Sequence, residues 1–164
     1  NARYSQKGKV DKNLLNYLLQ DSFIYKKPPK STGRENYNKY FILDIMTKFN
    51  KIDSNDFIRT LVNFTANCIK INIDKFISCD GQVKIYISGG GIHHSILLND
   101  IKKILNKNKI EIFYNNGLNS DFKEAFLMGV MGYAKYYNIP NNMISVTGAK
   151  KLDSYGDMYE WEYF

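Results

Sequence analysis

The sequence predicts an α/β fold in which long helices flank an incomplete parallel sheet. Three observations predict it: apolar residues at helical spacing over 54–77, a β-branched run over 83–88, and a second β-branched run over 110–114 that follows another helical stretch. A strand, a helix and a second strand in this order form a βαβ unit, which implies parallel pairing and a right-handed crossover. Because two short strands make no stable sheet alone, we expect the chain to supply part of a larger sheet.

Helix starts and stops divide the chain. Asp11 is placed to cap the first helix, and the Asp-Ser-Asn-Asp run at 53–56 is a strong start for the third. The Pro28-Pro29 pair interrupts regular structure, so the polar stretch after it is expected to form a structured loop. Gly81 is expected to end the third helix, and residues 157–164 could add an edge strand. The expected helices are 10–19, 37–49, 54–77, 95–105 and 120–137, and the expected strands are 83–88 and 110–114.

The composition excludes several classes of protein. The chain has 164 residues, of which 44% are hydrophobic and 24% charged, so it is too apolar to be disordered and has the length of one ordinary domain. No apolar run reaches the roughly 18 residues of a membrane-spanning helix, and no signal peptide is visible. Two cysteines, Cys68 and Cys79, are too few for a disulfide framework or a Cys-rich zinc site. We therefore expect a cytoplasmic protein with buried thiols and no membrane contact.

The net charge of +7 raises the question of nucleic-acid binding. Twenty of the twenty-three cationic residues are Lys, and they are scattered along the chain. The densest run, over 102–109, lies on one expected helix and its exit, where a solvated helix face explains it. We therefore expect no nucleic-acid partner, and a nucleic-acid binder, whose affinity would fall steeply with salt, is the third hypothesis. Part of the charge would also suit a polyphosphate ligand.

Gly89, Gly90 and Gly91 directly follow the first expected strand and precede a helix. Two explanations fit them equally: a ligand that lies against bare backbone, with nearby helix amides attracting an anion, or a tight turn. The pattern matches neither the G-x-G-x-x-G nor the P-loop fingerprint. His93 and His94 follow, but adjacent helical residues point about 100° apart, so the pair favours polar lining or capping over a zinc site.

Two further segments carry polar side chains suited to a ligand. One offers two cations, two hydroxyls and a carboxylate, which suit a sugar or a phosphate, in the run Lys30-Ser31-Thr32-Gly33-Arg34-Glu35. The alternative there is an Arg34–Glu35 turn that is held by caps from Ser31 and Thr32. Glu124 follows Asp121 at capping-box spacing, so that it either caps a helix or faces a ligand.

Taken together, these motifs resemble the anhydro-N-acetylmuramic acid kinase family. The P-K-S-T-G-R-E run at 29–35 and the S-V-T-G-A run at 145–149 are quite specific. The resemblance extends from about Ala2 to Lys151 and covers only the C-terminal half of the family's proteins. The other matching runs are Gly8-Lys9-Val10, Leu14-Leu15, Leu18-Leu19, Gly89-Gly90-Gly91, and Asp121 with Glu124-Ala125.

The resemblance implies a fold and an activity. The family belongs to the sugar kinase, actin and Hsp70 superfamily, whose members have two RNase H-like lobes with a nucleotide in the cleft, so residues 1–164 are expected to form part of the C-terminal lobe. The family's enzymes use ATP and Mg²⁺ to phosphorylate O6 of 1,6-anhydro-N-acetylmuramic acid while water opens the anhydro ring. The product is N-acetylmuramic acid 6-phosphate, and the reaction recycles a cell-wall sugar.

The resemblance also implies roles for single residues. The expected nucleotide contacts are Gly89, Gly90, Gly91 and His93, and the expected sugar contacts are Lys30, Ser31, Arg34 and Glu124. Glu124 would hold a sugar hydroxyl or the attacking water. The family usually has Asn where His94 stands. One expected contact to the adenosine or its ribose therefore involves a different side chain in this chain.

Two motifs of the family have no match in this chain: the phosphate loop G-T-S-x-D-G, and the D-T-G-P-G-N segment with the catalytic-base Asp. Both are expected upstream of Asn1, together with the metal ligands, so we expect no catalytic base in this chain and no kinase activity from it alone. The leading hypothesis is one lobe of an anhydro-sugar kinase that needs its N-terminal lobe as partner; a homodimer is also open. The alternative is a degenerate, non-catalytic module for nucleotide binding or assembly.

Overall fold

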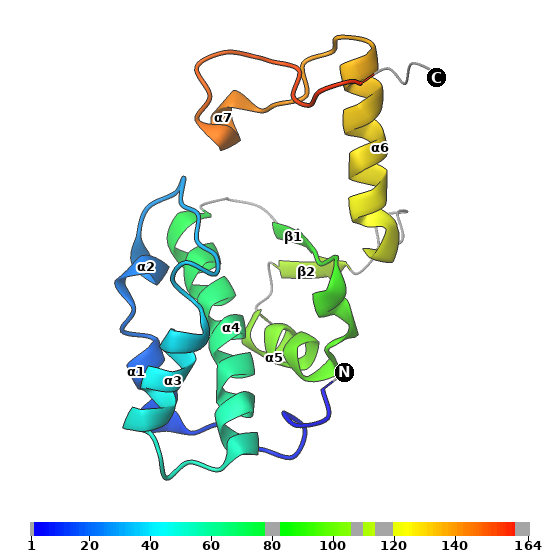
Figure 1. Ribbon diagram of the computed structural model, residues 1–164. Coiled ribbons are helices and arrows are strands. Elements are labelled where there is room, and N and C mark those ends of the chain that lie inside the picture. Colours follow the sequence, from blue (N-terminus) through cyan, green and yellow to red (C-terminus); the bar gives the residue numbers. More distant parts are fainter. Residues whose placement is uncertain (1, 78–82, 106–109, 114–119, 160–164) are drawn as a thin grey trace, which may run out of the picture. The chain divides into compact units, whose positions relative to one another are not determined.

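The computed structural model describes residues 2–77, 83–105, 110–113 and 120–159 and divides into two compact units (Figure 1). The first unit spans Asn1–Asn116 and the second unit spans Gly117–Phe164. The elements of the first unit are α1 (Lys12–Leu18), α2 (Ser22–Tyr25), α3 (Lys39–Lys48), α4 (Ser54–Phe76), β1 (Val83–Tyr86), the 3₁₀ helix η1 (Gly90–His93), α5 (Ser95–Leu105) and β2 (Ile110–Phe113). Those of the second unit are the 3₁₀ helix η2 (Ser120–Phe122), α6 (Lys123–Tyr136) and α7 (Ile144–Thr147).

The helices of the first unit lie close to where the sequence places them. α4 begins after Asp53, whose side chain accepts a hydrogen bond from the Asn55 N–H, and it runs for 23 residues. α5 has the predicted bounds. α1 and α3 each begin two residues later than predicted, α1 directly after the Asp11 cap. The helix α2 is not predicted, because a single turn is too short to show a periodic pattern.

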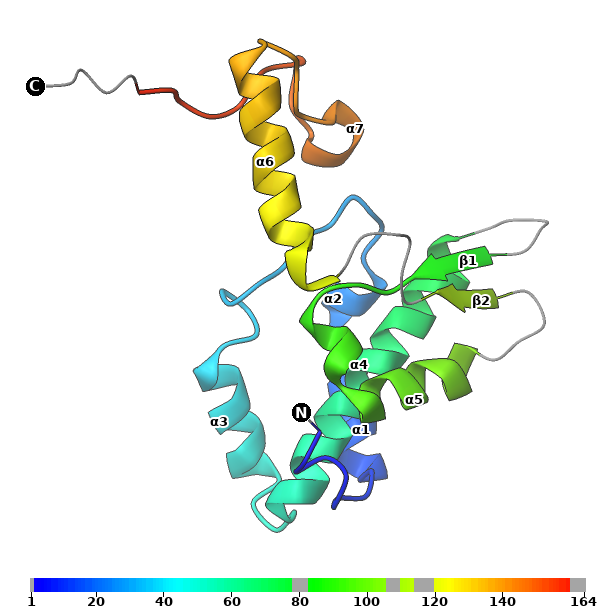
Figure 2. The ribbon, with the colours of Figure 1, turned by 90° about the vertical axis from the view of Figure 1, so that its right-hand side faces the viewer.

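β1 and β2 pair in parallel, with Val83 opposite Ile110 and Tyr86 opposite Phe113. α5 connects the two strands, so the predicted βαβ unit is confirmed; Figure 2 shows the strands side by side. Over the residues that the structure describes, the sheet has these two strands and the remaining elements are helices. The assignment to an RNase H-like lobe stays a prediction.

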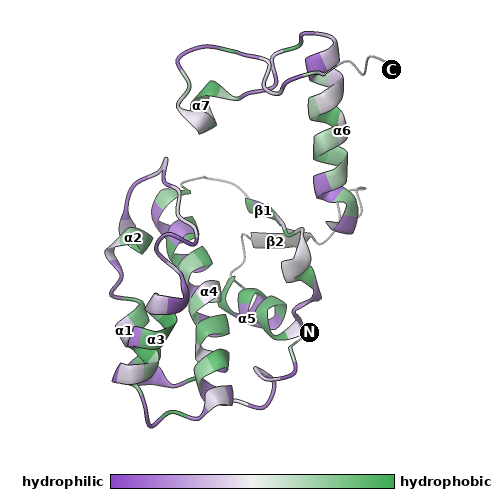
Figure 3. Cartoon of the chain, viewed as in Figure 1, coloured by the Kyte–Doolittle hydropathy of each residue, from purple (hydrophilic) through white to green (hydrophobic). Residues whose placement is uncertain are grey.

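α4 lies between two apolar clusters of the first unit. α1 and α3 pack against it on one side, and α5 and β1 pack against it on the other (Figure 1). Figure 3 shows the apolar residues along α4 and α5. The buried members are Leu14, Leu18, Ile45 and Phe57 in the first cluster and Ala66, Ile101 and Leu105 in the second. α4 is therefore the scaffold on which the other elements of this unit are placed.

The segment before α1 lies against the first turns of α4. The Lys9 N–H donates to the Asp56 carboxylate at 2.6 Å, and the Asp11 N–H donates to the Thr60 hydroxyl at 2.9 Å. Gly8 comes so close that a Cβ at its position would lie 2.1 Å from the Asn55 carbonyl oxygen. The close approach of the two backbones thus requires glycine here.

The second unit is built on α6 and the chain that follows it. Asn138 ends α6 with a φ of 52° and donates its N–H to the Lys135 carbonyl, which confirms the stop predicted there. Further on, the buried Asn142 side chain donates to the Lys151 carbonyl and accepts from the Asp153 N–H, each at 2.9 Å. These bonds tie the chain after α7 to the chain before it.

Some expectations fall on residues that the structure does not describe. Cys79 and Gly81 lie outside the described residues, as does most of the edge strand expected at 157–164; residues 157–159 are described and form no strand. Cys68 lies partly buried on α4. No helix in the described ranges is long and apolar enough to cross a membrane.

Candidate functional site

The three glycines form an open turn after β1. Gly89 has a φ of 79°, a conformation that favours glycine, and Gly90 begins η1. A Cβ built at Gly89, Gly90 or Gly91 would meet no atom within 4 Å. A tight turn therefore explains the glycine at 89 but not those at 90 and 91, whose main chain borders open space. This arrangement supports a ligand that lies against the backbone.

The position of the turn in the sheet also suits a ligand. It follows the carboxyl end of β1, and β1 belongs to a parallel βαβ unit. Ligands of open parallel sheets bind outside the carboxyl ends of the strands, where helix N-termini present free amides to anions. The α5 helix begins directly beyond the turn, at Ser95.

The two histidines of the turn differ in their surroundings. His93 is exposed at the end of η1. The Nδ1 atom of His94 accepts a hydrogen bond from the Leu97 N–H at 3.1 Å, so that His94 caps α5. Asn, which the family resemblance implies for this position, is among the best N-caps, and His supplies an equivalent acceptor. In the described ranges, no group of three or more His, Cys, Asp or Glu side chains could hold a metal ion.

In the loop after Pro29, the cations differ in their surroundings. The Lys30 ammonium donates to the carbonyls of Phe23 at 3.1 Å and Ile24 at 2.6 Å. Ser31 and Arg34 are exposed, and their side chains form no hydrogen bond or ion pair with any residue that the structure describes. Arg34 and Ser31 thus remain available to a ligand, whereas the Lys30 ammonium already donates two of its three hydrogen bonds to carbonyls of the protein.

The loop forms a turn, in which the expected Thr32 hydroxyl takes part together with the Glu35 side chain. Glu35 accepts a hydrogen bond from the Gly33 N–H at 2.6 Å and forms no pair with Arg34. The Thr32 hydroxyl accepts from the Asn36 side chain at 3.0 Å. Glu35 and Thr32 thus hold the turn, whereas the side chains of Arg34 and Ser31 make no hydrogen bond or ion pair among the described residues.

Glu124 does not form the capping box that its spacing suggests. η2 takes up residues 120–122, so α6 begins at Lys123 after Phe122, and Asp121 does not occupy the N-cap position. Glu124 lies in the first turn of α6, is exposed, and makes no hydrogen bond or ion pair within the described part of the chain. Its carboxylate remains available to a ligand.

The candidate residues are carried by different elements. The loop rests on α2 and α4, the glycine turn joins β1 to α5, and Glu124 belongs to the second unit. The sequence does not reveal one contact that holds this loop: the Tyr37 hydroxyl donates to the Asp21 carboxylate at 2.7 Å. No sequence signal indicates this pair, since the two residues lie sixteen positions apart in irregular segments.

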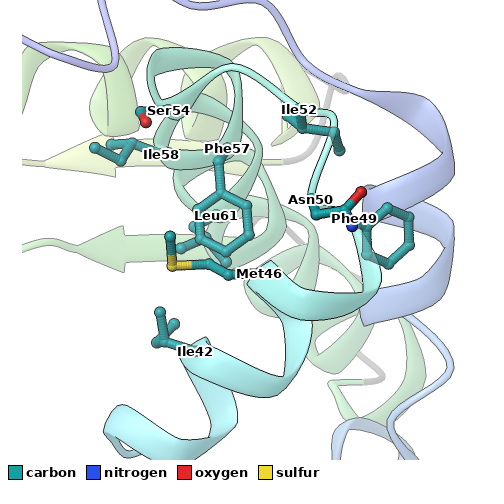
Figure 4. Close-up of a pocket in the computed structure, with 9 residues that line it drawn as sticks. All are labelled: Ile42, Met46, Phe49, Asn50, Ile52, Ser54, Phe57, Ile58 and Leu61. Carbon is teal, nitrogen blue, oxygen red and sulfur yellow. The ribbon is translucent and has the colours of Figure 1, made fainter.

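A separate apolar pocket lies between α3 and the start of α4 (Figure 4). Its volume is about 640 Å³. The polar members of its lining are Asn50 and Ser54, and the apolar members are Ile42, Met46, Phe49, Ile52, Phe57, Ile58 and Leu61. This lining has no charged group for a phosphate, so the pocket is not suited to the nucleotide.

Comparison with known proteins gives a match over nearly the whole chain. A family model described as anhydro-N-acetylmuramic acid kinase matches residues 1–161. The chain belongs to the anhydro-N-acetylmuramic acid kinase family. Curated proteins of that name are 34% identical over 151 residues in Clostridioides difficile (strain 630), 31% identical over 159 residues in Synechococcus sp. and 30% identical over 154 residues in Bacillus cereus (strain AH187).

These alignments cover 92%, 96% and 92% of this chain but 39%, 42% and 40% of the three relatives. The chain thus spans about two-fifths of the length of the anhydro-N-acetylmuramic acid kinases that it matches. The family predicted from the motifs at 29–35 and 145–149 is confirmed. The roles of the single residues and the assignment to the C-terminal lobe stay predictions.

Proposed function

We propose that this chain is the C-terminal, nucleotide- and sugar-binding lobe of a cytoplasmic, ATP-dependent kinase that hydrolyses and 6-phosphorylates 1,6-anhydro-N-acetylmuramic acid. The family match over residues 1–161 carries the proposal. The open glycine turn at the carboxyl end of β1 supports its nucleotide part. In this proposal the second, RNase H-like lobe comes from the part of the kinase that this chain does not contain.

The glycine turn is proposed to receive the nucleotide. With no Cβ at Gly89, Gly90 and Gly91, the adenosine can lie flat on the main chain. His93, exposed beside the turn, would border the same ligand. His94 would influence the nucleotide only indirectly, through the hydrogen bond that caps α5 and sets where this helix begins.

The sugar is proposed to meet Glu124 and the loop. The Glu124 carboxylate, which has no partner among the described residues, can accept a hydrogen bond from a sugar hydroxyl or from the water that attacks the anhydro carbon. Water, whose proton passes to the catalytic base of the other lobe, forms a bond to C1 as the C1–O6 bond breaks, and the freed O6 takes the γ-phosphoryl group as ADP leaves. Arg34 and Ser31 would hold polar groups of the sugar or the phosphates.

Mg²⁺ would neutralise charge on the transferred phosphate. The described residues offer no group of three or more metal-binding side chains, whereas the glycine turn fits a nucleotide. We therefore propose that the Mg²⁺ ligands and the catalytic base belong to the other lobe, and that this chain binds and orients the ligands.

Calorimetry with ATP and an assay for phosphorylation of 1,6-anhydro-N-acetylmuramic acid test the proposal, with this chain alone and within a full-length protein of the family. ATP binding by the chain and turnover only by the full-length protein are expected. Gly90→Val should abolish ATP binding without unfolding, because its side chain would occupy the space above the turn. Thr65→Val, at an exposed position on α4, is the control.

Two results would change the conclusion. Unaltered ATP affinity in a folded Gly90→Val protein would remove the nucleotide site from the turn. ATP binding without any phosphorylation by the full-length protein would indicate the non-catalytic module instead.

A further inference from the structure

The loop between α2 and α3 is fixed at its start by Lys30. Besides its two hydrogen bonds to the carbonyls that end α2, the Lys30 ammonium lies 5.2 Å from the ring centroids of both Phe23 and Phe76. Phe76 is the last residue of α4. One ammonium group therefore joins the loop to α2 and to α4, through charge-assisted hydrogen bonds and cation–π contacts.

Tyr37 fixes the other end of the same loop. Its hydroxyl donates to one oxygen of the Asp21 carboxylate, while the other oxygen accepts from the Phe23 N–H at 2.8 Å and so caps α2. The Tyr37 ring also packs edge-on against Phe41, with ring centroids 5.1 Å apart. Burial, followed by the hydrogen bond to Asp21, raises the pKa of the Tyr37 hydroxyl, which therefore stays a donor.

The six residues between these two anchors, 31–36, form a turn with internal hydrogen bonds. The Tyr37 N–H donates to the Gly33 carbonyl at 3.1 Å, and the carboxylate of Glu35 is occupied by the Gly33 N–H. A Cβ at Gly33 would lie 2.9 Å from that carboxylate, so the turn is closely packed at its centre. Arg34 stands exposed on this turn with its guanidinium unused by the described residues.

We infer that Lys30 and Tyr37 are positioning residues that fix the two ends of the turn 31–36 and so hold the Arg34 guanidinium ready to bind an oxyanion of the ligand. The inference rests on the proposed function and replaces the sugar contact that the family resemblance implied for Lys30, because Lys30 acts through the turn and does not contact the sugar. A guanidinium presents two parallel N–H groups that match the oxygens of a carboxylate or a phosphate. Both groups occur among the proposed ligands: a carboxylate on the acid sugar and phosphates on ATP.

Tryptic cleavage after Arg34 tests the anchors without any need for activity, since proteases cut loops that open locally. Lys30→Met and Tyr37→Phe should each speed cleavage after Arg34 by about fivefold or more, the factor that corresponds to one lost hydrogen bond. Lys30→Arg should restore the wild-type rate, because Arg can donate to the same carbonyls and lie over the same rings. The matched controls are Lys27→Met and Tyr40→Phe, whose charged or hydroxyl groups form no hydrogen bond or ion pair within the described ranges.

Steady-state kinetics of the full-length protein test Arg34. Arg34→Gln should raise one KM by about tenfold or more, as expected for loss of a charge-assisted hydrogen bond, with a smaller effect on kcat. A rise in the KM of the sugar identifies the carboxylate, and a rise in the KM of ATP identifies the phosphate. The same ligand should slow tryptic cleavage after Arg34 in the wild-type protein.

The outcomes separate this inference from the proposed function. Unchanged cleavage in Lys30→Met together with a raised sugar KM would show that Lys30 itself contacts the ligand, and would overturn the anchor role. Unchanged KM values in Arg34→Gln would overturn the oxyanion site. If the wild-type protein phosphorylated nothing, the proposed function would fail, while the cleavage rates would still decide the role of the anchors.

Discussion

The Arg59 guanidinium on α4 forms two hydrogen bonds with the Asp100 carboxylate on α5, at 2.6 and 2.8 Å. Asp100 is 5% exposed, and the Asn63 side chain donates a third hydrogen bond to it at 2.9 Å. The pair joins residues that are 41 positions apart and fixes α5 along α4. Since the glycine turn leads directly into α5, this contact also sets where the turn lies on the scaffold.

Arg59→Ala is expected to lower the free energy of unfolding by about 3 kcal/mol, because it leaves the buried Asp100 carboxylate without its charge partner. Urea unfolding followed by circular dichroism measures the change. The matched control is Lys70→Ala, which removes a more exposed pair with Asp74 one turn along α4 and should change the stability by about 0.5 kcal/mol or less. Equal losses in the two variants would show that the buried pair contributes no more than a surface pair.

His94 provides a second test of how the turn is held. His94→Ala should destabilise the protein by about 1 kcal/mol, because the Leu97 N–H loses its cap, and His94→Asn should stay within a few tenths of the wild type. Thermal and urea unfolding of the three proteins check this order. Equal stability of His94→Ala and His94→Asn would contradict a capping role for the imidazole.

Local sequence signals predicted those parts of the fold that depend on neighbouring residues. The long periodic pattern and the Asp53 cap predicted α4, and the β-branched runs predicted both strands of the βαβ unit. α2 was missed because it is one turn long. The capping box at Asp121 was wrong because a 3₁₀ turn takes up residues 120–122, and spacing alone cannot separate this turn from the first turn of an α-helix.

The sequence indicates which residues belong to the candidate site, but it does not indicate which contacts fix them in place. The glycines and the P-K-S-T-G-R-E run stand out in the sequence, and the structure leaves Arg34 and the glycine main chain open. The contact of Lys30 with Phe76 joins residues that are distant in the chain, as does that of Arg59 with Asp100. Such pairs depend on how the helices pack, which no local pattern in one sequence contains.

Gly8→Ala should destabilise the protein by about 1–3 kcal/mol, because its methyl group would overlap the Asn55 carbonyl and push the segment 8–11 away from α4. Gly132→Ala is the matched control: nothing lies within 4 Å of a Cβ there, and in the interior of α6 alanine should stabilise by up to about 1 kcal/mol. Urea unfolding measures both. A neutral Gly8→Ala would mean that the segment shifts without loss of its contacts to Asp56 and Thr60.

Cys68 gives a prediction about pH. Burial, together with the nearby Asp21 carboxylate, raises the pKa of the Cys68 thiol from 9.0 to about 11. At pH 8 the folded protein should therefore hold about a hundredfold less thiolate at this position than the unfolded chain, since two pKa units separate the states. Alkylation by iodoacetamide, measured in a Cys79→Ser background, should be correspondingly slow until urea unfolds the protein.

The same shift makes the stability depend on pH. The folded state keeps the Cys68 proton, which the unfolded state releases above about pH 9, so the contribution of this thiol is complete below pH 9 and is lost as the pH rises towards 11. Relative to Cys68→Ala, which has no proton to lose, the wild type should lose up to about 2 kcal/mol of unfolding free energy across this interval. The comparison removes the titration of lysines and tyrosines, which both proteins share. Parallel stability curves for the two proteins, together with fast alkylation of the folded wild type at pH 8, would show that the thiol on α4 is open to solvent.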